Sequence, residues 1–325
     1  MKPCRTHLPT FLSPEASLGH WLVLLCLLAL GLSGLETTTR CFGGIAANGQ
    51  MEASADVSLD ATFEAGAGWR VCCLGTEGAG NILVGGFFNN LCGVARPYFG
   101  RLRPDGTLDS DFTASPNNSV LTVAVQDDGN ILVAGTFTSL SGEPRTGLAR
   151  LAPNGTLDRD FKPEVNLVPN SAPPSPAVSC LAVQADGRIV VAGTFTHLCG
   201  QPRAGLGRLK PDGTLDGGFD PNPSGSVFAV ITQPDGKILV AGLFTNVCNQ
   251  PRMGIARLYP DGSLDSSFNP MAPPNQYALA LQPDGRIIAG GSFQTMGGQP
   301  RKLIARLDPD GKLDDSFNPG EAESC

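Results

Sequence analysis

The sequence predicts an all-β protein built from a repeated sheet, and three observations support this prediction. Glycine (41 residues) and proline (27 residues) are abundant, while hydrophobic residues still make up 41% of the chain. This mixture is typical of a turn-rich β protein with a core, because disordered chains have low hydrophobicity. No stretch keeps the 3.6-residue period of an amphipathic helix, and two sequence motifs recur at matching intervals.

The first motif is a β-branched run, "NILVGGFF", whose copies begin at Asn81, Asn130, Arg188, Lys237 and Arg286. The second motif is "PDGTLDSDF", whose copies contain Gly106, Gly155, Gly213, Gly262 and Gly311. Successive copies of both motifs are separated by 49, 58, 49 and 49 residues. Two independent motifs with one set of intervals indicate five copies of a single structural unit.

Each unit is interpreted as four strands, which in the fourth copy are residues 227–233, 237–244, 254–260 and 263–268. In its two Pro-Asp-Gly turns, proline presets the first corner and glycine takes the left-handed position that closes the hairpin. One turn joins the first two strands and the other joins the last two, so both turns lie at one edge of the unit. The opposite edge carries the longer links, such as "TNVCNQPR".

Four antiparallel strands in a unit of about 50 residues are typical of a β-propeller blade. The predicted fold is therefore a β-propeller of four-stranded blades with five full repeats. An extra N-terminal strand motif, "SLDATF" at residues 58–63, stands in register before the first repeat. This motif leaves two arrangements open, a closed five-bladed ring with an additional strand and an open arc. We expect the propeller to span residues 57–325, in units of 64–112, 113–161, 162–219, 220–268 and 269–319.

The N-terminal segment resembles a targeting sequence. Lys2 and Arg5 precede an apolar run of 12 residues that ends at Leu32. That length suits a signal peptide and is short for a membrane span of about 20 residues. We expect a signal peptide or N-terminal anchor over residues 1–33, then a linker or degenerate partial repeat over 34–56. The expected location is secreted, periplasmic or cell surface, with no membrane contact beyond that anchor.

The full repeat reads Gln-x-Asp-Gly-(Lys/Arg)-Ile-x-Val-(Ala/Gly)-Gly-x-Phe, then Gly-x-Pro-Arg, then Ala-Arg-Leu-x-Pro-Asp-Gly-x-Leu-Asp-x-x-Phe. This pattern resembles the delta-60 repeat over residues 59–319. The first copy departs from it, with "TEGAGN" in place of Gln-Pro-Asp-Gly and "GVARPYFGRL" in place of Gly-Gln-Pro-Arg. The resemblance implies a bacterial, mostly exported, propeller-forming protein, and it implies no particular activity.

Charge and motif content narrow the function classes. The formal net charge of -7 repels phosphate backbones, so no nucleic-acid partner is expected. His7 and His20 precede the apolar run, which leaves His197 as the one histidine of the repeats. No serine elbow, zinc motif or phosphate loop is present. The spacing of acidic residues in Asp-Gly-x-Leu-Asp serves a turn better than a calcium site. We therefore expect no catalytic residues, no metal ligands and no cofactor.

Arginine and aspartate recur at fixed places in the repeat. The third strand carries Arg101, Arg150, Arg208, Arg257 and Arg306, and the fourth strand carries Asp109, Asp158, Asp216, Asp265 and Asp314. A second arginine set, in the link before the third strand, is Arg96, Arg145, Arg203, Arg252 and Arg301. These arginines suit either structural pairing with carboxylates and loop carbonyls or a ring that binds anions. Their identical repetition favours the structural interpretation.

Residues at which the copies differ are the candidate binding residues: Trp69, Arg70, Asn117, His197 and Tyr277. Val178 follows Phe161 by 17 positions, whereas the corresponding step in the other units is 8, which suits a binding loop or a tolerated insertion. Cys41 and Cys325 flank the repeats, and a closed ring would bring the two ends together. These two cysteines are a possible disulfide in an oxidising compartment.

The main functional hypothesis is an exported, non-catalytic scaffold that binds a protein or other surface macromolecule through the edge of the longer links. One alternative is a hydrolase or lyase with acidic residues at the propeller axis. The other alternative is a purely structural surface repeat module.

Overall fold

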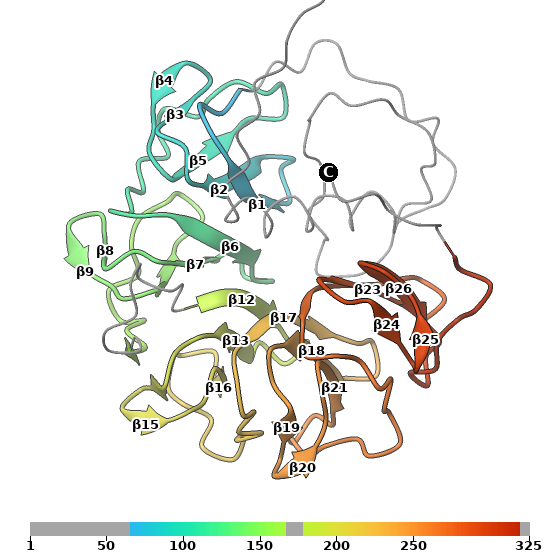
Figure 1. The fold of residues 1–325 in the computed structure, drawn as a ribbon. Helices are drawn as coiled ribbons and strands as arrows, with labels where there is room; N and C mark the ends of the chain where they lie inside the picture. The colour runs from blue at the N-terminus through green and yellow to red at the C-terminus, as the bar shows by residue number, and fades with distance from the viewer. Residues whose placement is uncertain (1–65, 167–177, 319–325) are drawn as a thin grey trace, which may run out of the picture.

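The computed structural model describes residues 66–166 and 178–318, and its ribbon is shown in Figure 1. The described residues form strands and turns without an α-helix, and they contain no helix long and apolar enough to cross a membrane. The predicted all-β fold is confirmed. The N-terminal segments 1–33 and 34–56, the motif at 58–63 and most of the long insertion lie outside the described residues.

Five three-stranded antiparallel sheets form the blades, numbered one to five in chain order. The first strands are β1 (Val71–Thr76), β6 (Val120–Val125), β12 (Val178–Val183), β17 (Val227–Thr232) and β22 (Gln276–Leu281). The central strands are β2 (Ile82–Gly86), β7 (Ile131–Gly135), β13 (Ile189–Gly193), β18 (Ile238–Gly242) and β23 (Ile287–Gly291). The third strands are β5 (Phe99–Leu102), β10 (Leu148–Leu151), β16 (Leu206–Leu209), β21 (Ile255–Leu258) and β26 (Ile304–Leu307).

The fourth strand of each blade is short. In blade four it pairs with β21 through the bridge between Leu258 and Leu264, and the Asp265 amide donates to the Arg257 carbonyl at 2.9 Å. The chain then turns, because the Asp265 carboxylate accepts the backbone N–H and the hydroxyl of Ser267. Such side-chain-to-backbone bonds compete with the ladder and end the strand.

A small hairpin in each long link was not expected from the sequence. These hairpins pair β3 (Asn90–Leu91) with β4 (Val94–Ala95), β8 (Ser139–Leu140) with β9 (Glu143–Pro144), β14 (His197–Leu198) with β15 (Gln201–Pro202), β19 (Asn246–Val247) with β20 (Gln250–Pro251), and β24 (Thr295–Met296) with β25 (Gln299–Pro300). In blade three, β11 (Val165–Asn166) adds a third strand beside β14. Both central residues of each hairpin turn have positive φ, as two-residue type I′ turns require.

A β-bulge in the first strand explains why glycine ends each of the five central strands. In blade four the register shifts between Val227 and Ala229, opposite Gly242. A Cβ atom on Gly242 would lie 2.1 Å from the carbonyl oxygen of Ser226, so no larger residue fits without moving the backbone.

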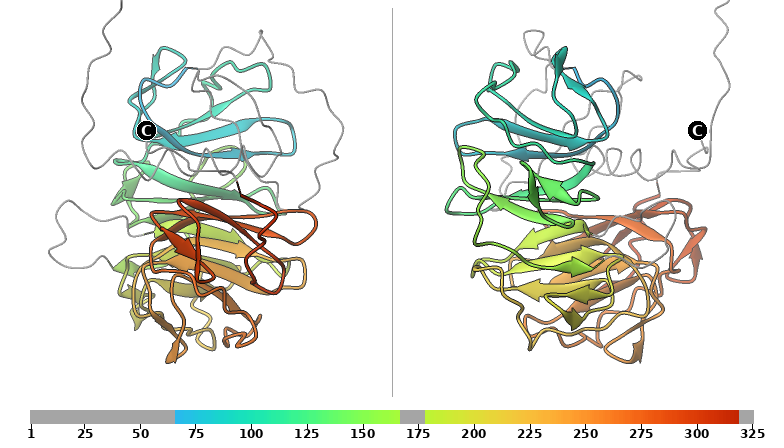
Figure 2. Two further views of the ribbon diagram at one scale, coloured as in Figure 1. Left: turned by 45° about the vertical axis from the view of Figure 1, so that its right-hand side comes forward. Right: turned by 90° about the vertical axis from the view of Figure 1, so that its left-hand side faces the viewer.

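Successive blades pack face to face around an arc (Figures 1 and 2). In units one to four, the last phenylalanine packs between its own blade and the next. Phe112, for example, is fully buried in one cluster with Phe99 of blade one and Val120 of blade two. First strands contact each other in the order β1, β6, β12, β17 and β22, and within the described residues β22 shows no comparable packing against β1. The described blades therefore form an arc.

Candidate functional site

The two edges of the blades differ in chemistry, and we name them for their connections. The tight-turn edge carries the two short turns of each blade, which touch each other: a Cβ on Gly236 would lie 3.3 Å from the ring of Pro260. The long-link edge carries the hairpin links after the central strands and the connections between blades. The two predicted tight turns thus share one edge, as the sequence indicated.

The repeated arginines and aspartates of the third and fourth strands form one recurring cluster near the tight-turn edge. In blade three, Arg208 donates from Nε to Asp216 at 2.9 Å, and its guanidinium lies 4.4 Å from the ring centroid of Phe219. Its Nη1 also reaches the carbonyl of Pro260 in blade four. The same cation–π pair and carboxylate bond recur in all five blades, with Nε–O distances of 2.8–2.9 Å. Each such arginine of blades one to four therefore joins its own blade to the next.

These pairings favour the anionic form of Asp265 and Asp314. Burial would raise the pKa of Asp265, but hydrogen bonds from Ser267 and Arg257 outweigh it and lower the pKa to about 2. A hydrogen bond from Ser316 is the largest influence on Asp314 and, with Arg306, lowers its pKa to about 2 as well. A general acid needs a pKa near the working pH, so these two carboxylates are poorly suited to that role.

The second arginine set, in the long links, binds backbone carbonyls. Arg96 donates to the carbonyl of Phe112 at 2.9 Å, and Arg203 donates to those of Pro202 and Gly217 at 2.7 and 3.3 Å. Arg203 is 8% exposed. Such buried guanidinium groups fasten the links to the blade.

The other nucleophilic and metal-binding side chains of the described residues do not gather at one site. Burial raises the pKa of the Cys180 thiol, which keeps it protonated and weakly nucleophilic. Within residues 66–166 and 178–318, no group of three or more His, Cys, Asp or Glu side chains is placed to hold a metal ion.

The sequence-predicted binding residues lie in four different blades and do not form one pocket. Trp69 is 72% exposed at the long-link edge, and the neighbouring Arg70 guanidinium lies 4.5 Å from the ring centroid of Phe87. His197 lies in β14, where its Nδ1 is 3.0 Å from the hydroxyl of Thr196. Tyr277 lies in β22, and its side chain is outside the described part of the chain, as are Cys41 and Cys325.

Asn117 has a local bonding role. Its Oδ1 accepts the backbone N–H groups of Thr138 and Ser139 at 2.9 and 3.0 Å, and its Nδ2 donates to the Thr138 hydroxyl. Ser224 occupies the corresponding position in blade four, where its Oγ accepts the N–H groups of Thr245 and Asn246. Both side chains fasten the inter-blade connection to the neighbouring link.

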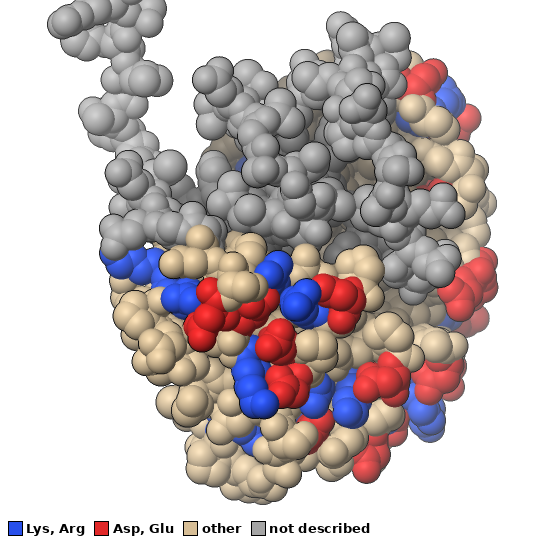
Figure 3. Space-filling view, turned by 90° about the vertical axis from the view of Figure 1, so that its right-hand side faces the viewer, with Lys and Arg blue, Asp and Glu red and all other residues tan. Residues whose placement is uncertain are grey.

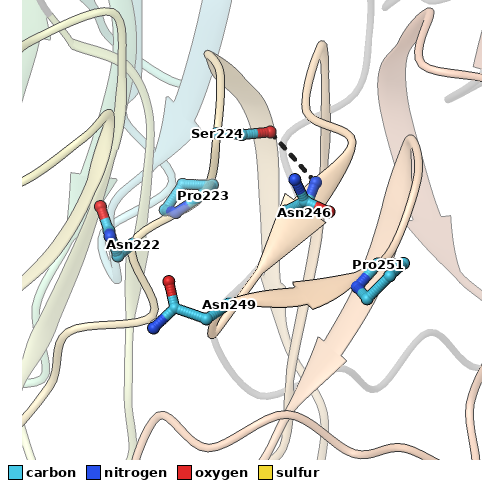
Figure 4. Close-up of a pocket in the computed structure, with 6 residues that line it drawn as sticks. All are labelled: Asn222, Pro223, Ser224, Asn246, Asn249 and Pro251. Carbon is cyan, nitrogen blue, oxygen red and sulfur yellow. Dashed lines mark hydrogen bonds between the residues drawn. The ribbon is translucent and has the colours of Figure 1, made fainter.

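A pocket of about 360 Å³ opens at the long-link edge of blade four, and we call it the blade-four pocket. It is lined by Asn222, Pro223, Ser224, Asn246, Asn249 and Pro251. The connection from blade three supplies the first three residues, and the hairpin β19–β20 with its turn supplies the others. Figure 4 shows Asn249 extending its carboxamide from the hairpin toward Asn222 in the connection. None of the six lining residues was singled out from the sequence.

One sequence signal could have found this pocket. Asn249 has φ of 57°, and the corresponding positions of the other units are Gly93, Gly142, Gly200 and Gly298. Asparagine is the side-chain-bearing residue that best tolerates this left-handed conformation. The substitution thus adds a carboxamide to the long-link edge at a place where the repeat otherwise has none.

Charges of both signs are interleaved over the face of the molecule drawn in Figure 3. Ion pairs also form within single tight turns of the described residues, such as Arg286 with Asp284 at 2.7 Å and Lys312 with Asp310 at 2.9 Å. Neither sign forms a continuous patch on that face.

A family model described as "Domain of unknown function (DUF5122) beta-propeller" matches residues 80–112, 126–161, 184–219, 233–268 and 282–317, together more than half of the chain. No curated protein matches the chain. Many solved structures resemble it distantly, and they include the following three.

The first is a protein of unknown function from Bacteroides caccae, 15% identical, with a TM-score of 0.45, covering 76% of this chain and 80% of that one. The second is virginiamycin B lyase from Staphylococcus aureus, 13% identical, with a TM-score of 0.47, covering 75% of this chain and 68% of that one. The third is the extracellular domain of a putative one-component system from B. thetaiotaomicron, 14% identical, with a TM-score of 0.46, covering 81% of this chain and 32% of that one.

Proposed function

Because the chain belongs to the DUF5122 β-propeller family, a family of unknown function, we propose that it is an exported, non-catalytic scaffold that binds a protein through its long-link edge. The family match confirms the resemblance to the delta-60 repeat and the five-repeat β-propeller that the sequence predicts. The family description names no activity, so the proposal rests on the distribution of side chains over the two edges.

Exposed apolar side chains carry the proposal. Six large apolar side chains of the described residues are at least 40% exposed, and five of them lie at the long-link edge. These five are Trp69, Val94, Leu243, Met253 and Met271. Aromatic residues and methionine are enriched at protein interfaces, so their exposure along one edge suits contact with a protein partner. The sixth, Tyr259, lies in a tight turn at the opposite edge.

The lowered pKa values of the described aspartates favour a scaffold over the alternative of an acidic hydrolase or lyase. Every described aspartate with a resolved shift has its pKa lowered, including Asp109 and Asp158, where bonds from arginine outweigh the effect of burial. Glycosidase-type chemistry needs one carboxyl whose pKa is raised.

Export is the second part of the proposal, and it is supported by Lys2 and Arg5 ahead of the apolar run that ends at Leu32. N-terminal sequencing of the protein recovered outside the cytoplasm tests it. A mature terminus near residue 34 supports cleavage of a signal peptide, and recovery of the whole chain from the cytoplasm refutes export.

Site-specific photo-crosslinking in the producing organism tests the binding edge. A photoreactive amino acid replaces Trp69, Met253 or Met271, and a matched variant carries it at Tyr259 on the opposite edge. We expect one discrete protein adduct from the long-link positions, competed away by unlabelled wild-type protein, and none from position 259. A purely structural module predicts no competed adduct from any position, and that result would refute the proposal.

A further inference from the structure

We propose that the blade-four pocket binds the main-chain amide groups of an extended, uncharged peptide segment. This inference rests on the proposed function, because it specifies how part of a protein partner would be held at the long-link edge. It concerns only this pocket, whose six lining residues all belong to the unit 220–268.

The first argument is the charge of the lining. Three asparagines, one serine and two prolines surround the pocket, and none of them is ionisable. The lining offers no opposite charge to a charged ligand group, so the pocket favours neutral polar ligands.

The second argument is the unused hydrogen-bonding capacity. Within the described residues, the carboxamides of Asn222, Asn246 and Asn249 make no side-chain hydrogen bond, although the backbone N–H of Asn246 is bound by Ser224. Each carboxamide offers two N–H donors and one acceptor oxygen. A peptide group also presents one donor and one acceptor, so a carboxamide can satisfy both groups of an extended main chain.

The third argument is that the walls are held in place while the carboxamides remain available. The hydroxyl of Ser224 accepts the N–H groups of Thr245 and Asn246 at 3.0 Å each. The Cys248 amide donates to the Pro221 carbonyl at 2.7 Å, which joins the hairpin turn to the connection. A preformed wall lowers the entropic cost of binding.

The fourth argument concerns the class of ligand. Sugar sites commonly stack the apolar face of the ring on an aromatic side chain, and no aromatic residue lines this pocket. Pro223 and Pro251 supply apolar surface without such a stacking face, which suits the small side chains of an extended peptide. The pocket therefore favours a peptide over an oligosaccharide.

Nuclear magnetic resonance titration of the full chain tests the proposal. The probe is a blocked trialanine, and the observed signals are the side-chain NH₂ resonances of Asn222, Asn246 and Asn249. We expect saturable shifts of these resonances, with dissociation constants on the order of millimolar for so small a ligand. The control ligand is the same peptide with N-methylated peptide bonds, which keeps the carbonyl acceptors but lacks the N–H donors and should therefore bind more weakly.

Two variants make the test specific to the pocket. Asn249→Gly places in blade four the residue that the other units use at this left-handed position, so folding should be preserved. It should weaken trialanine binding roughly two- to tenfold, as expected for the loss of one or two hydrogen bonds. Gly298→Asn adds a carboxamide at the matched position of blade five and should leave the affinity unchanged.

Three results would overturn the inference: no saturable shift with trialanine, equal shifts with the N-methylated peptide, or shifts with cellotriose and none with trialanine. These outcomes are distinguishable from failure of the proposed function. If a partner still crosslinks from Met253 and Met271 in the Asn249→Gly background with unchanged competition, the scaffold proposal stands and the role of the pocket is refuted.

Discussion

The carboxylate of Asp265 provides a quantitative prediction, because its side chain is 1% exposed and its pKa is lowered to about 2. An aspartate in an unfolded chain has a pKa of about 3.9, so folding lowers it by about 1.9 units, equivalent to about 2.6 kcal/mol at neutral pH. Since the folded pKa is the lower one, this stabilisation is fully present above the unfolded pKa. It is lost as the pH falls through the folded pKa, and about half of it is gone at about pH 3.

Urea unfolding of the wild type and of Asp265→Asn, at about pH 7 and about pH 3, measures this contribution. We expect the difference in unfolding free energy between the two proteins to shrink by about 1.3 kcal/mol at the lower pH. Losses in the variant that do not depend on pH cancel in this comparison. Asp127→Asn, which removes an exposed carboxylate, is the control for surface charge. An equal difference at both pH values would refute the assignment of the low pKa to Asp265.

Three further predictions concern stability. Phe219→Ala should lower the free energy of unfolding by about 3–5 kcal/mol in urea, because Phe219 is fully buried between two blades. Phe317 is only partly buried, so Phe317→Ala should lower it clearly less. Equal losses in the two variants would contradict the inter-blade role of Phe219. Gly242→Ala should lower the melting temperature strongly, since the added Cβ meets the Ser226 carbonyl. Gly217→Ala should leave it almost unchanged, since the added Cβ there has no atom within 4 Å. Ser224→Ala should lower the free energy of unfolding by about 1 kcal/mol, because two backbone N–H groups lose their acceptor. An unchanged free energy of unfolding would show that water replaces the hydroxyl as acceptor.

The repeat made much of the fold predictable from the sequence. The β-branched runs such as 237–244 became central strands, and each Pro-Asp-Gly became a tight turn with a left-handed glycine, as at Gly262 with φ of 93°. The pairing of Arg257 with Asp265 also followed from residues that recur together, because a repeated pair has a repeated environment.

The hairpins of the long links and the blade-four pocket were harder to predict. A two-residue hairpin is usually signalled by Asn-Gly or Asp-Gly, whereas blade three uses Cys199 with Gly200, both at positive φ. The pocket joins Asn222 to Asn249, and only the folded connection places these two residues on opposite sides of one space. The sequence shows that Asn249 departs from the repeat, but it does not show which residues lie near Asn249 in space.

The contacts between blades also define where this protein could be cut and rejoined. A segment from just after one terminal phenylalanine to the next, such as 220–268, keeps its own arginine, carboxylate and phenylalanine together with the turn that accepts the preceding blade's arginine. Such a segment carries the acceptor for the preceding junction and the donor for the following one, so exchange of whole segments between positions preserves the arginine-to-carbonyl bonds between blades. Because the six residues of the blade-four pocket all lie within 220–268, the pocket can be transplanted as a cassette and its binding measured in a new context.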